Sequence, residues 1–342
     1  MVPLQAVTPE RLAARVSGLT LAEARKVVAC VHRGEPVEPS SAVRRSAVDA
    51  VRRSGMIPTL EVVAETASQV DPFVKYVLAG GDGARFEAVR IPLERAGRFT
   101  ACVSSQVGCA LACEFCATGR LGLRRNLEAW EIVEQVRVIR ARLVPGSRVH
   151  GVVFQGMGEP LANADAVLDA IAVMTDPCAL AIDARSITVC TAGLPAGIRR
   201  LAREAPKVRL GISISSAIAA TRASLMPITR AHGLDEVLAA AADHARATGL
   251  APMWAVTLLA GVNDGNADAH ALVERARAFE AATGKRPRLS IIAYNDVDGA
   301  GFARSPREAE FRAVISAAGL PSHRRYSGGS DVAAACGQLV GR

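Results

Sequence analysis

Apolar runs and helical patterns alternate along most of the chain. Short apolar runs typical of buried strands occur six times, at residues 100–103, 151–157, 186–191, 207–214, 252–259 and 288–294. Segments with apolar residues at helical spacing separate and follow them, at 127–143, 163–175, 195–204, 234–247, 266–282 and 306–318. Six strand–helix units in succession predict an α/β fold with a parallel sheet and helices outside it, either an open doubly wound sheet or a curved partial barrel.

The start of the chain follows a different pattern. Thr8 and Thr20 stand at the N-cap positions of two predicted helices, and a third, arginine-bearing helix is expected within 41–54. Two apolar runs then flank Gly80-Gly81-Asp82-Gly83, which predicts a β-hairpin over residues 72–92. We therefore expect a small helical and hairpin region before the α/β core.

Positive charge is concentrated in this first region. The chain has a net charge of +8, and its first 60 residues hold nine Lys and Arg against five Asp and Glu, which is half of the excess. This favours a polyanionic partner such as nucleic acid, with a basic solvated surface as the alternative. We divide the chain into an accessory region with a candidate RNA-binding role at 1–92, a core at 93–330 and a C-terminal segment at 331–342.

Three of the eight cysteines lie close together, and the others are scattered. Cys109, Cys113 and Cys116 have C-x3-C-x2-C spacing, which is not the pattern of a disulfide scaffold. The sequence contains no secretory signal and no apolar run of about eighteen residues, so we expect a cytoplasmic protein without a membrane span. Nothing in the sequence requires more than a monomer.

The three crowded cysteines suit a [4Fe–4S] cluster. Each thiolate ligates one iron, so three thiolates leave the fourth iron open to an external amino and carboxylate group. A structural zinc site and chance clustering are the alternatives. Zinc would need a fourth ligand, for which Cys102 is the only nearby candidate, and its spacing is not that of an ordinary zinc finger.

Residues that can bind or react with a ligand follow four of the predicted strands. Glycines let the backbone approach a ligand, and a carboxylate among them can accept a hydrogen bond from an ammonium group. Because the carboxyl ends of parallel strands meet at one face, these residues predict one shared pocket. They are Gly156-Met157-Gly158-Glu159-Pro160, Cys190-Thr191-Ala192-Gly193, Ser213-Ile214-Ser215 and Asn295.

Three separate motifs, at 102–113, 156–160 and 335–339, are similar to those of the RlmN/Cfr family of radical S-adenosylmethionine (SAM) RNA methyltransferases. The resemblance runs from about residue 72 to the end. It implies a partial (β/α)6 TIM-like barrel and a [4Fe–4S] cluster on the three crowded cysteines. It also implies SAM contacts, which we assign to Gly158, Glu159, Cys190, Ser213, Ile214, Ser215 and Asn295.

The resemblance also implies roles for isolated residues. Cys336 would take a methyl group from one SAM, and a radical made from a second SAM would activate that group for addition to an adenine ring carbon, C2 rather than C8. Cys102 would then attack the sulfur of Cys336 and release the product, and Glu87 would accept a proton. The substrate would be rRNA, tRNA or both, and the electron donor a protein such as flavodoxin or ferredoxin.

Some positions depart from the family pattern. Ser215 replaces a histidine, Cys190 stands where serine is common, and 293–296 read Ala-Tyr-Asn-Asp instead of Pro-Trp-Asn-Pro. These departures leave two other functions open, a radical SAM enzyme acting on a peptide or small metabolite and a zinc-stabilised RNA-binding module. The segment His323-Arg324-Arg325 is either a phosphate clamp or a solvated turn.

Overall fold

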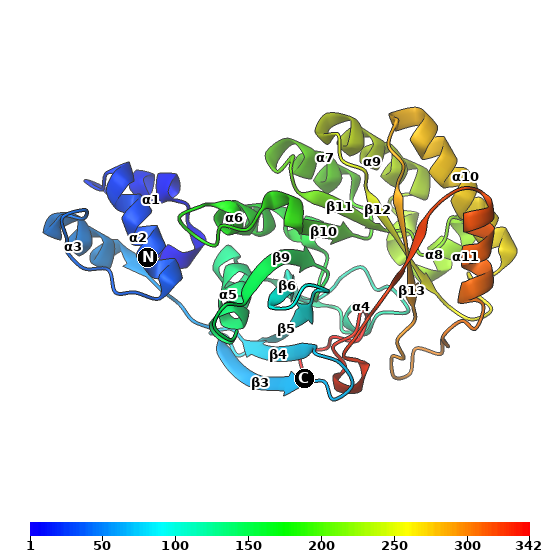
Figure 1. Ribbon diagram of the computed structural model, residues 1–342, viewed down its shortest axis with the longest axis horizontal. Helices are drawn as coiled ribbons and strands as arrows, with labels where there is room; N and C mark the ends of the chain where they lie inside the picture. The colour runs from blue at the N-terminus through cyan, green and yellow to red at the C-terminus, as the bar shows by residue number, and fades with distance from the viewer.

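The computed structural model describes residues 1–342, and a ten-stranded sheet organises most of them (Figure 1). All six predicted strands are present and lie side by side in chain order, with a seventh parallel strand at the end. The parallel strands are β6 (Arg98–Val103), β9 (Arg148–Phe154), β10 (Ile187–Thr191), β11 (Arg209–Ser213), β12 (Met253–Leu258), β13 (Arg288–Ala293) and β14 (Ser322–Arg325).

The six predicted helices also form, and Figure 1 shows α7, α9, α10 and α11 around the outside of the strands. Their apolar faces join the strands in one large core, in which Trp254 packs edge-on against Phe279. The helices are α5 (Ala129–Ala141), α6 (Ala164–Thr175), α7 (Pro195–Glu204), α9 (Leu234–Thr248), α10 (Asn266–Thr283) and α11 (Glu308–Ala317), with a further short helix α8 (Ala219–Leu225). None of the helices combines the length and apolarity needed to cross a bilayer.

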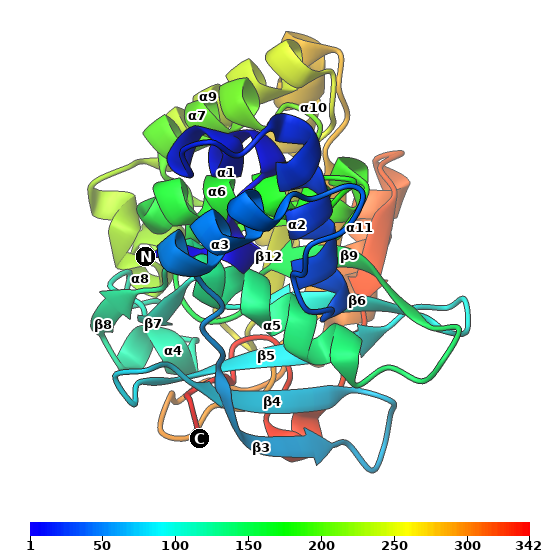
Figure 2. The ribbon, with the colours of Figure 1, turned by 90° about the vertical axis from the view of Figure 1, so that its left-hand side faces the viewer.

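The first 56 residues form a helical unit with its own small core, which faces the viewer in Figure 2. Thr20 begins α2 with a capping box, because its hydroxyl accepts the Glu23 amide and the Glu23 carboxylate accepts the Thr20 amide. The unit consists of β1 (Val2–Pro3), α1 (Pro9–Arg15), α2 (Leu21–Arg33), α3 (Arg45–Ser54) and β2 (Gly55–Met56), and its turn η1 (Leu4–Ala6) contacts α5 and α6.

The predicted hairpin is present but belongs to the main sheet. Strands β4 (Val74–Ala79) and β5 (Arg85–Pro92) pair antiparallel, β5 pairs with β6, and β3 (Glu61–Ala67) forms the outer edge. The structure therefore groups the hairpin with the core and not with the helical unit. A hairpin pattern specifies the pairing of its own two strands and not the sheet that they join.

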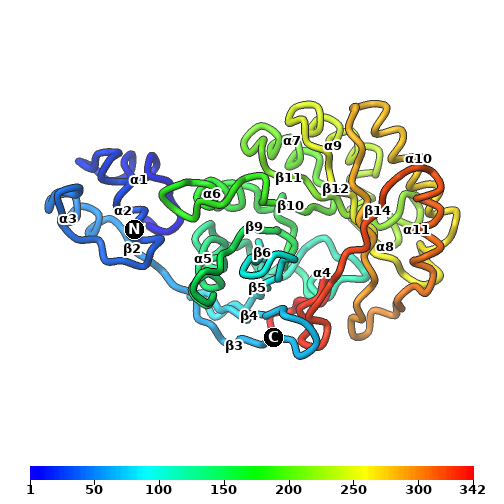
Figure 3. The backbone as a smooth tube through the Cα atoms, in the orientation of Figure 1, coloured from blue at the N-terminus to red at the C-terminus, as the bar shows by residue number.

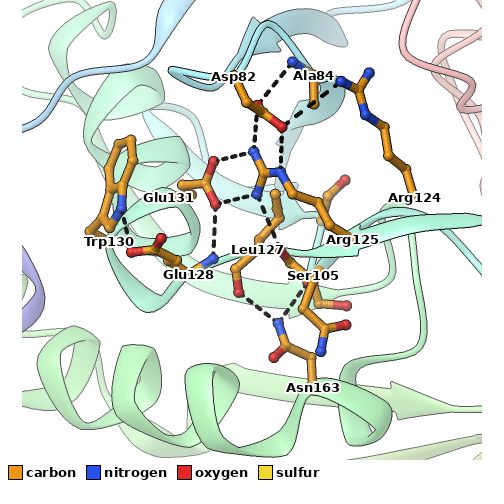
Figure 4. A network of polar contacts seen from close by, with 12 residues as sticks. Asp82, Ala84, Ser105, Arg124, Arg125, Leu127, Glu128, Trp130, Glu131 and Asn163 are labelled. Atoms are coloured by element: carbon orange, nitrogen blue, oxygen red, sulfur yellow. Dashed lines mark hydrogen bonds and ion pairs between the residues drawn. The ribbon is translucent and has the colours of Figure 1, made fainter.

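A polar network ties the tip of this hairpin to the core (Figure 4). Arg125 donates to both carboxylate oxygens of Asp82 at 2.9 Å and to those of Glu131 at 2.7 and 2.8 Å. Asn163 donates to the carbonyls of Ser105 and Leu127, both at 2.8 Å. These bonds fix the small sheet of β7 (Gln106–Gly108) and β8 (Leu123–Asn126), from which the cysteine loop and the short helix α4 (Ala117–Arg120) project.

Single turns of 3-10 helix complete the chain. They are η2 (Pro160–Asn163), η3 (Ala184–Ser186), η4 (Pro227–Arg230) and η5 (Ser330–Val332). After β14 the C-terminal segment turns back to pass beside α4 and ends near β3 and β4, as the red tube of Figure 3 shows.

Candidate active site

A cavity of about 1060 Å³, partly open to solvent, lies where the parallel strands end. The cysteine loop, the strand ends and the C-terminal segment all contribute to its wall. The predicted site residues that line it are Cys109, Cys113, Cys116, Gly158, Glu159, Cys190, Ser213, Ser215 and Cys336. The structure therefore brings together residues that lie more than 200 positions apart in the chain.

The cysteine loop is held by tight backbone turns. Gly108 has a φ of 78°, and a side chain there would lie 1.9 Å from the carbonyl oxygen of Gly122, so only glycine fits. The amide of Cys109 donates to that same oxygen at 2.9 Å. Ala112 has a φ of 50°, which turns the chain between the first two cysteines.

The three crowded thiols line the same cavity. No three His, Cys, Asp or Glu side chains are grouped as ligands of one metal ion would be. Burial raises the pKa of Cys109 to about 11 and that of Cys113 further, and the neighbouring cysteines contribute to both shifts. Thiols that share a cavity wall in this way suit a polynuclear cluster, in which each binds its own iron and the positive irons stabilise the thiolates.

Glu159 adds a carboxylate to the cavity wall near Cys109 and Cys113. It is only 3% exposed and accepts hydrogen bonds from the amides of Leu161 at 3.0 Å and Ala192 at 2.8 Å. Burial raises its pKa, and these hydrogen bonds oppose the shift. Gly158 lets the turn pass close to Gln106, because a side chain there would come within 2.5 Å of the Gln106 Cβ. The fixed carboxylate suits a ligand ammonium group.

The end of β11 is organised by a residue that sequence reasoning missed. Arg222 is fully buried and donates to the carbonyls of Ala192 at 2.5 Å and Ile214 at 3.2 Å, and to the Thr229 hydroxyl at 2.6 Å. Ile214 is buried and does not line the cavity, whereas its neighbours Ser213 and Ser215 do. No local sequence signal marks Arg222, because its partners lie on other loops.

Cys336 lies between two cavities. It lines the large cavity and also a smaller one of about 490 Å³, whose wall includes Cys102 and Arg325. The Cys336 amide donates to the Ser327 hydroxyl at 2.9 Å, and its carbonyl accepts from the Asn295 side chain at 3.0 Å. Asn295, predicted as a SAM contact, thus holds the C-terminal segment and is not part of the large cavity's wall.

Cys102 is buried on β6 and faces the smaller cavity. Burial, and then the nearby Cys336, raise its pKa to about 12. Cys190 lines the large cavity, and its thiol donates to the Gln155 side chain at 3.7 Å. Gln155 lines both cavities and was not predicted from the sequence.

Glu87 lies apart from both cavities. It is fully buried on β5, where its carboxylate accepts the amides of Val340 at 2.9 Å and Arg342 at 3.1 Å. The Lys75 ammonium lies 3.2 Å from the same carboxylate. In this arrangement Glu87 fixes the end of the chain.

The segment His323-Arg324-Arg325 is neither a solvated turn nor a free clamp. It belongs to strand β14, and its side chains face different surroundings. Arg324 is exposed and forms an ion pair with Glu308 at 3.1 Å, whereas Arg325 reaches the smaller cavity. The sequence did not predict this strand, because it has no apolar run.

Comparison with known proteins agrees with this site. Residues 103–276 match the Radical SAM superfamily. A probable RNA methyltransferase of Sorangium cellulosum is 58% identical over 97% of this chain and 90% of its own length. A probable dual-specificity RNA methyltransferase RlmN of Moorella thermoacetica is 38% identical over 96% of this chain and 94% of its own length. A dual-specificity RNA methyltransferase RlmN of Syntrophobacter fumaroxidans is 42% identical over 78% of this chain and 76% of its own length.

A solved structure confirms the architecture. The crystal structure of a radical SAM methyltransferase from Sphaerobacter thermophilus superposes with a TM-score of 0.87 at 33% identity, and the match covers 100% of both chains. The predicted radical SAM α/β fold is therefore confirmed, and a zinc-stabilised binding module is excluded. The chain belongs to the RlmN-type RNA methyltransferases of the radical SAM superfamily.

Proposed function

We propose that this chain methylates carbon 2 of an adenine in RNA through a methyl group carried by Cys336. The observation that carries the proposal is the position of Cys336 on the wall between the large cavity, with its three crowded cysteines, and the smaller cavity that contains Cys102. Relatives named as dual-specificity RNA methyltransferases support an RNA substrate. A radical SAM enzyme that did not transfer carbon through sulfur would not need Cys102 and Cys336 in addition to the three crowded cysteines.

The large cavity would bind SAM and the cluster. Cys109, Cys113 and Cys116 would hold a [4Fe–4S] cluster, which when bound supplies the electron that converts SAM into a carbon radical. Glu159 would accept a hydrogen bond from the SAM ammonium group, while Ser213 and Ser215 line the cavity beside it. The chain's own contribution is to fix these groups and exclude water.

Cys336 and Cys102 would perform the sulfur chemistry. The Cys336 thiolate displaces the methyl group from the SAM sulfonium, whose sulfur keeps the electron pair of the broken bond. The radical derived from the second SAM would take one hydrogen atom from the S-methyl group of Cys336, and the resulting carbon radical would add to the adenine ring carbon. The Cys102 thiolate would then attack the Cys336 sulfur, and a disulfide would form as the carbon–sulfur bond breaks. The released carbon takes a proton and becomes the product methyl group, and the one surplus electron passes to a carrier such as flavodoxin or ferredoxin.

Glu87 would accept the proton that leaves the adenine ring. For this role the amides of Val340 and Arg342 must first leave its carboxylate, which requires the end of the chain to move. Gly337 and Gly341, with φ values of 89° and 79°, lie in this end of the chain in a conformation that favours glycine. The contacts described above would then represent the state without RNA.

The N-terminal helical unit would contribute to RNA binding in the cytoplasm. Helix α3 exposes Arg45, Arg52 and Arg53, and no carboxylate forms an ion pair with any of them. Arg52 donates to the Val37 carbonyl at 3.0 Å, and the guanidinium groups of Arg45 and Arg53 make no hydrogen bond. Guanidinium groups without a carboxylate partner on one helix suit the phosphate backbone of RNA. Replacing Arg45 and Arg53 by Glu should weaken RNA binding at low salt and reduce the salt dependence of this binding. An unchanged affinity for RNA would reject this role of the N-terminal unit.

Mass spectrometry of nucleosides tests the proposal directly. RNA from a deletion strain is compared with RNA from strains complemented by the wild type, C336A or C102A, with rRNA and tRNA analysed separately. We expect 2-methyladenosine only with the wild type, and RNA covalently trapped on the C102A protein. A product methylated at C8 would overturn the C2 assignment, and unchanged RNA would favour a peptide or metabolite substrate.

A further inference from the structure

Arg325 reaches the thiol pair from the far edge of the parallel sheet. It is the last residue of β14 and is in register with Ile292 of β13. Strands β14 and β6 end the parallel part of the sheet on opposite sides. Both strands nevertheless contribute to the smaller cavity, which Arg325 lines together with Cys102 and Cys336.

Arg325 is half-buried, and its guanidinium has neither an ion-pair nor a hydrogen-bond partner in the protein. No carboxylate forms an ion pair with it, and its buried Nη1 has no hydrogen-bond acceptor. No Asp or Glu lines the smaller cavity, and the buried carboxylates of Glu87 and Glu159 are engaged elsewhere, with Lys75 and with backbone amides respectively. A buried charge without a counter-charge is costly, so the site must supply one.

The ionisable groups that act on Arg325 are all sulfurs. Burial alone would lower the pKa of Arg325, but Cys336 of the C-terminal segment, Cys190 of β10 and Cys102 of β6 more than offset this, and its pKa is raised. Arg325 in turn lowers the pKa of Cys102 against the larger effect of burial. The cation therefore favours the thiolate of Cys102, the form that reacts, although burial keeps the thiol as the resting form.

We infer that Arg325 is a positioning residue of the methyl relay, the cation that balances the negative charge when Cys336 and Cys102 react as thiolates. The inference rests on the proposed function for the roles of the two cysteines. On ionisation each thiol gives its proton to solvent, and the guanidinium balances the remaining negative charge. The Cys336 thiolate can then form its bond to the SAM methyl carbon, and the Cys102 thiolate its later bond to the Cys336 sulfur.

The backbone supports this assignment. Ser327, two residues after Arg325, accepts the Cys336 amide at 2.9 Å and the Asn295 side chain at 3.0 Å. The end of β14 thus holds both the charge beside the thiols and the hydroxyl that fixes the Cys336 backbone. A change in this segment would alter both the position and the ionisation of the methyl carrier.

Thiol reactivity provides the test. The variants R325M and R325K are compared with the wild type and with R324Q, a control on the same strand whose side chain is exposed and paired with Glu308. Iodoacetamide labelling of Cys336 is followed by peptide mass spectrometry across a pH range, in the anaerobic holoenzyme without SAM. In R325M we expect labelling about tenfold slower at neutral pH, because the reacting thiolate loses its counter-charge.

The other variants and a redox titration complete the test. R325K keeps the charge and should retain most of the labelling rate, and R324Q should match the wild type. In R325M the Cys102–Cys336 disulfide should form about tenfold more readily against glutathione, because the reduced thiolates lose their counter-ion. Iron content and circular dichroism report whether R325M is folded, and R325K provides a second folded comparison.

The results separate this inference from the proposed function. Unchanged labelling and an unchanged disulfide equilibrium in folded R325M would overturn the role of Arg325. A loss confined to RNA affinity would also overturn this role, because Arg325 would then be a phosphate contact. Slower labelling in R325M, combined with no methylation of Cys336 by SAM in the wild type, would support the counter-ion and reject the relay.

Discussion

The two halves of the site are built in different ways. Glu159, Ser213 and Ser215 lie at or after the ends of strands of a continuous sheet. The buried Arg222 joins the loop after β11 to the loop after β10, whose Ala192 amide donates to Glu159. The C-terminal segment has no strand after β14, and it is held by a few side chains, among them Asn295, which binds the Cys336 carbonyl.

This difference matches the tasks that we propose for the two halves. A cofactor site benefits from rigid walls, whereas a methyl carrier must reach the donor, the adenine and Cys102 in turn. Segments with few buried apolar contacts open at low cost in free energy. The comparison therefore predicts that changes in the strand half act on stability and cofactor content, and that changes in the C-terminal half act on turnover.

The largest effects should follow from removing one sulfur in each half. C113A and C336A should each lower methylation by at least about a thousandfold, which corresponds to roughly 4 kcal/mol of activation free energy. Only C113A should lose iron, because Cys336 is not a proposed ligand. Iron analysis measures the cluster content and nucleoside mass spectrometry measures methylation, with C30S on α2 as the control. An iron-free C336A protein would contradict the separation of roles.

The next effect concerns Arg222. R222M removes three hydrogen bonds and leaves buried carbonyls without a donor, so the free energy of unfolding should fall by about 3 kcal/mol. Urea denaturation measures this, with R203M on the exposed face of α7 as the matched control. Equal stabilities of the two variants would show that Arg222 does not organise the strand half.

A smaller effect is expected from Asn295. N295A loses the bonds to the Cys336 carbonyl and the Ser327 hydroxyl, and turnover should fall about tenfold while the free energy of unfolding changes by about 1 kcal/mol or less. Single-turnover kinetics and urea denaturation separate these quantities. A loss of stability as large as that of R222M would place Asn295 with the rigid half.

The smallest effect is a pH dependence of stability. Burial raises the pKa of Glu159, so the folded protein keeps a proton that the unfolded chain releases, and stability should fall as pH rises between the ordinary carboxyl pKa and the raised value. E159Q should remove this slope. Glu23 gives the opposite case, because its hydrogen bond from Arg44 lowers its pKa, and its contribution is lost as pH falls. Urea denaturation from about pH 3 to pH 8 compares E159Q and E23Q each with the wild type, because the Glu23 contribution is lost below the ordinary carboxyl pKa. The two variants should change the pH dependence of stability in opposite directions, and changes of the same sign would contradict the prediction.

Local signals explain which elements the sequence predicted. The six buried strands have apolar runs, and the Thr20 capping box and the Cys109 to Cys116 spacing lie within a few residues. Strand β14 was missed because Ser322–Arg325 is polar and its central residues are exposed. Its position is fixed by pairing with β13, which no local pattern encodes.

Long-range contacts explain what the sequence could not supply for the site. The residues lining the large cavity were largely predicted, because they follow strands whose ends must meet. The partners of Glu87, Asn295 and Arg222 lie 7 to 255 positions away and depend on how loops pack. Sequence pattern alone could therefore name Asn295 and Glu87 without indicating that both hold the C-terminal segment.

The isotopic composition of the product tests the central claim most directly. The enzyme is supplied with SAM whose methyl group is fully deuterated, and the methylated adenine is analysed by mass spectrometry. Passage through Cys336 with hydrogen abstraction predicts a product methyl group with two deuterium atoms and one hydrogen from solvent, and a deuterated methyl group on Cys336. A product that keeps all three deuterium atoms, formed equally well by C336A, would contradict the relay.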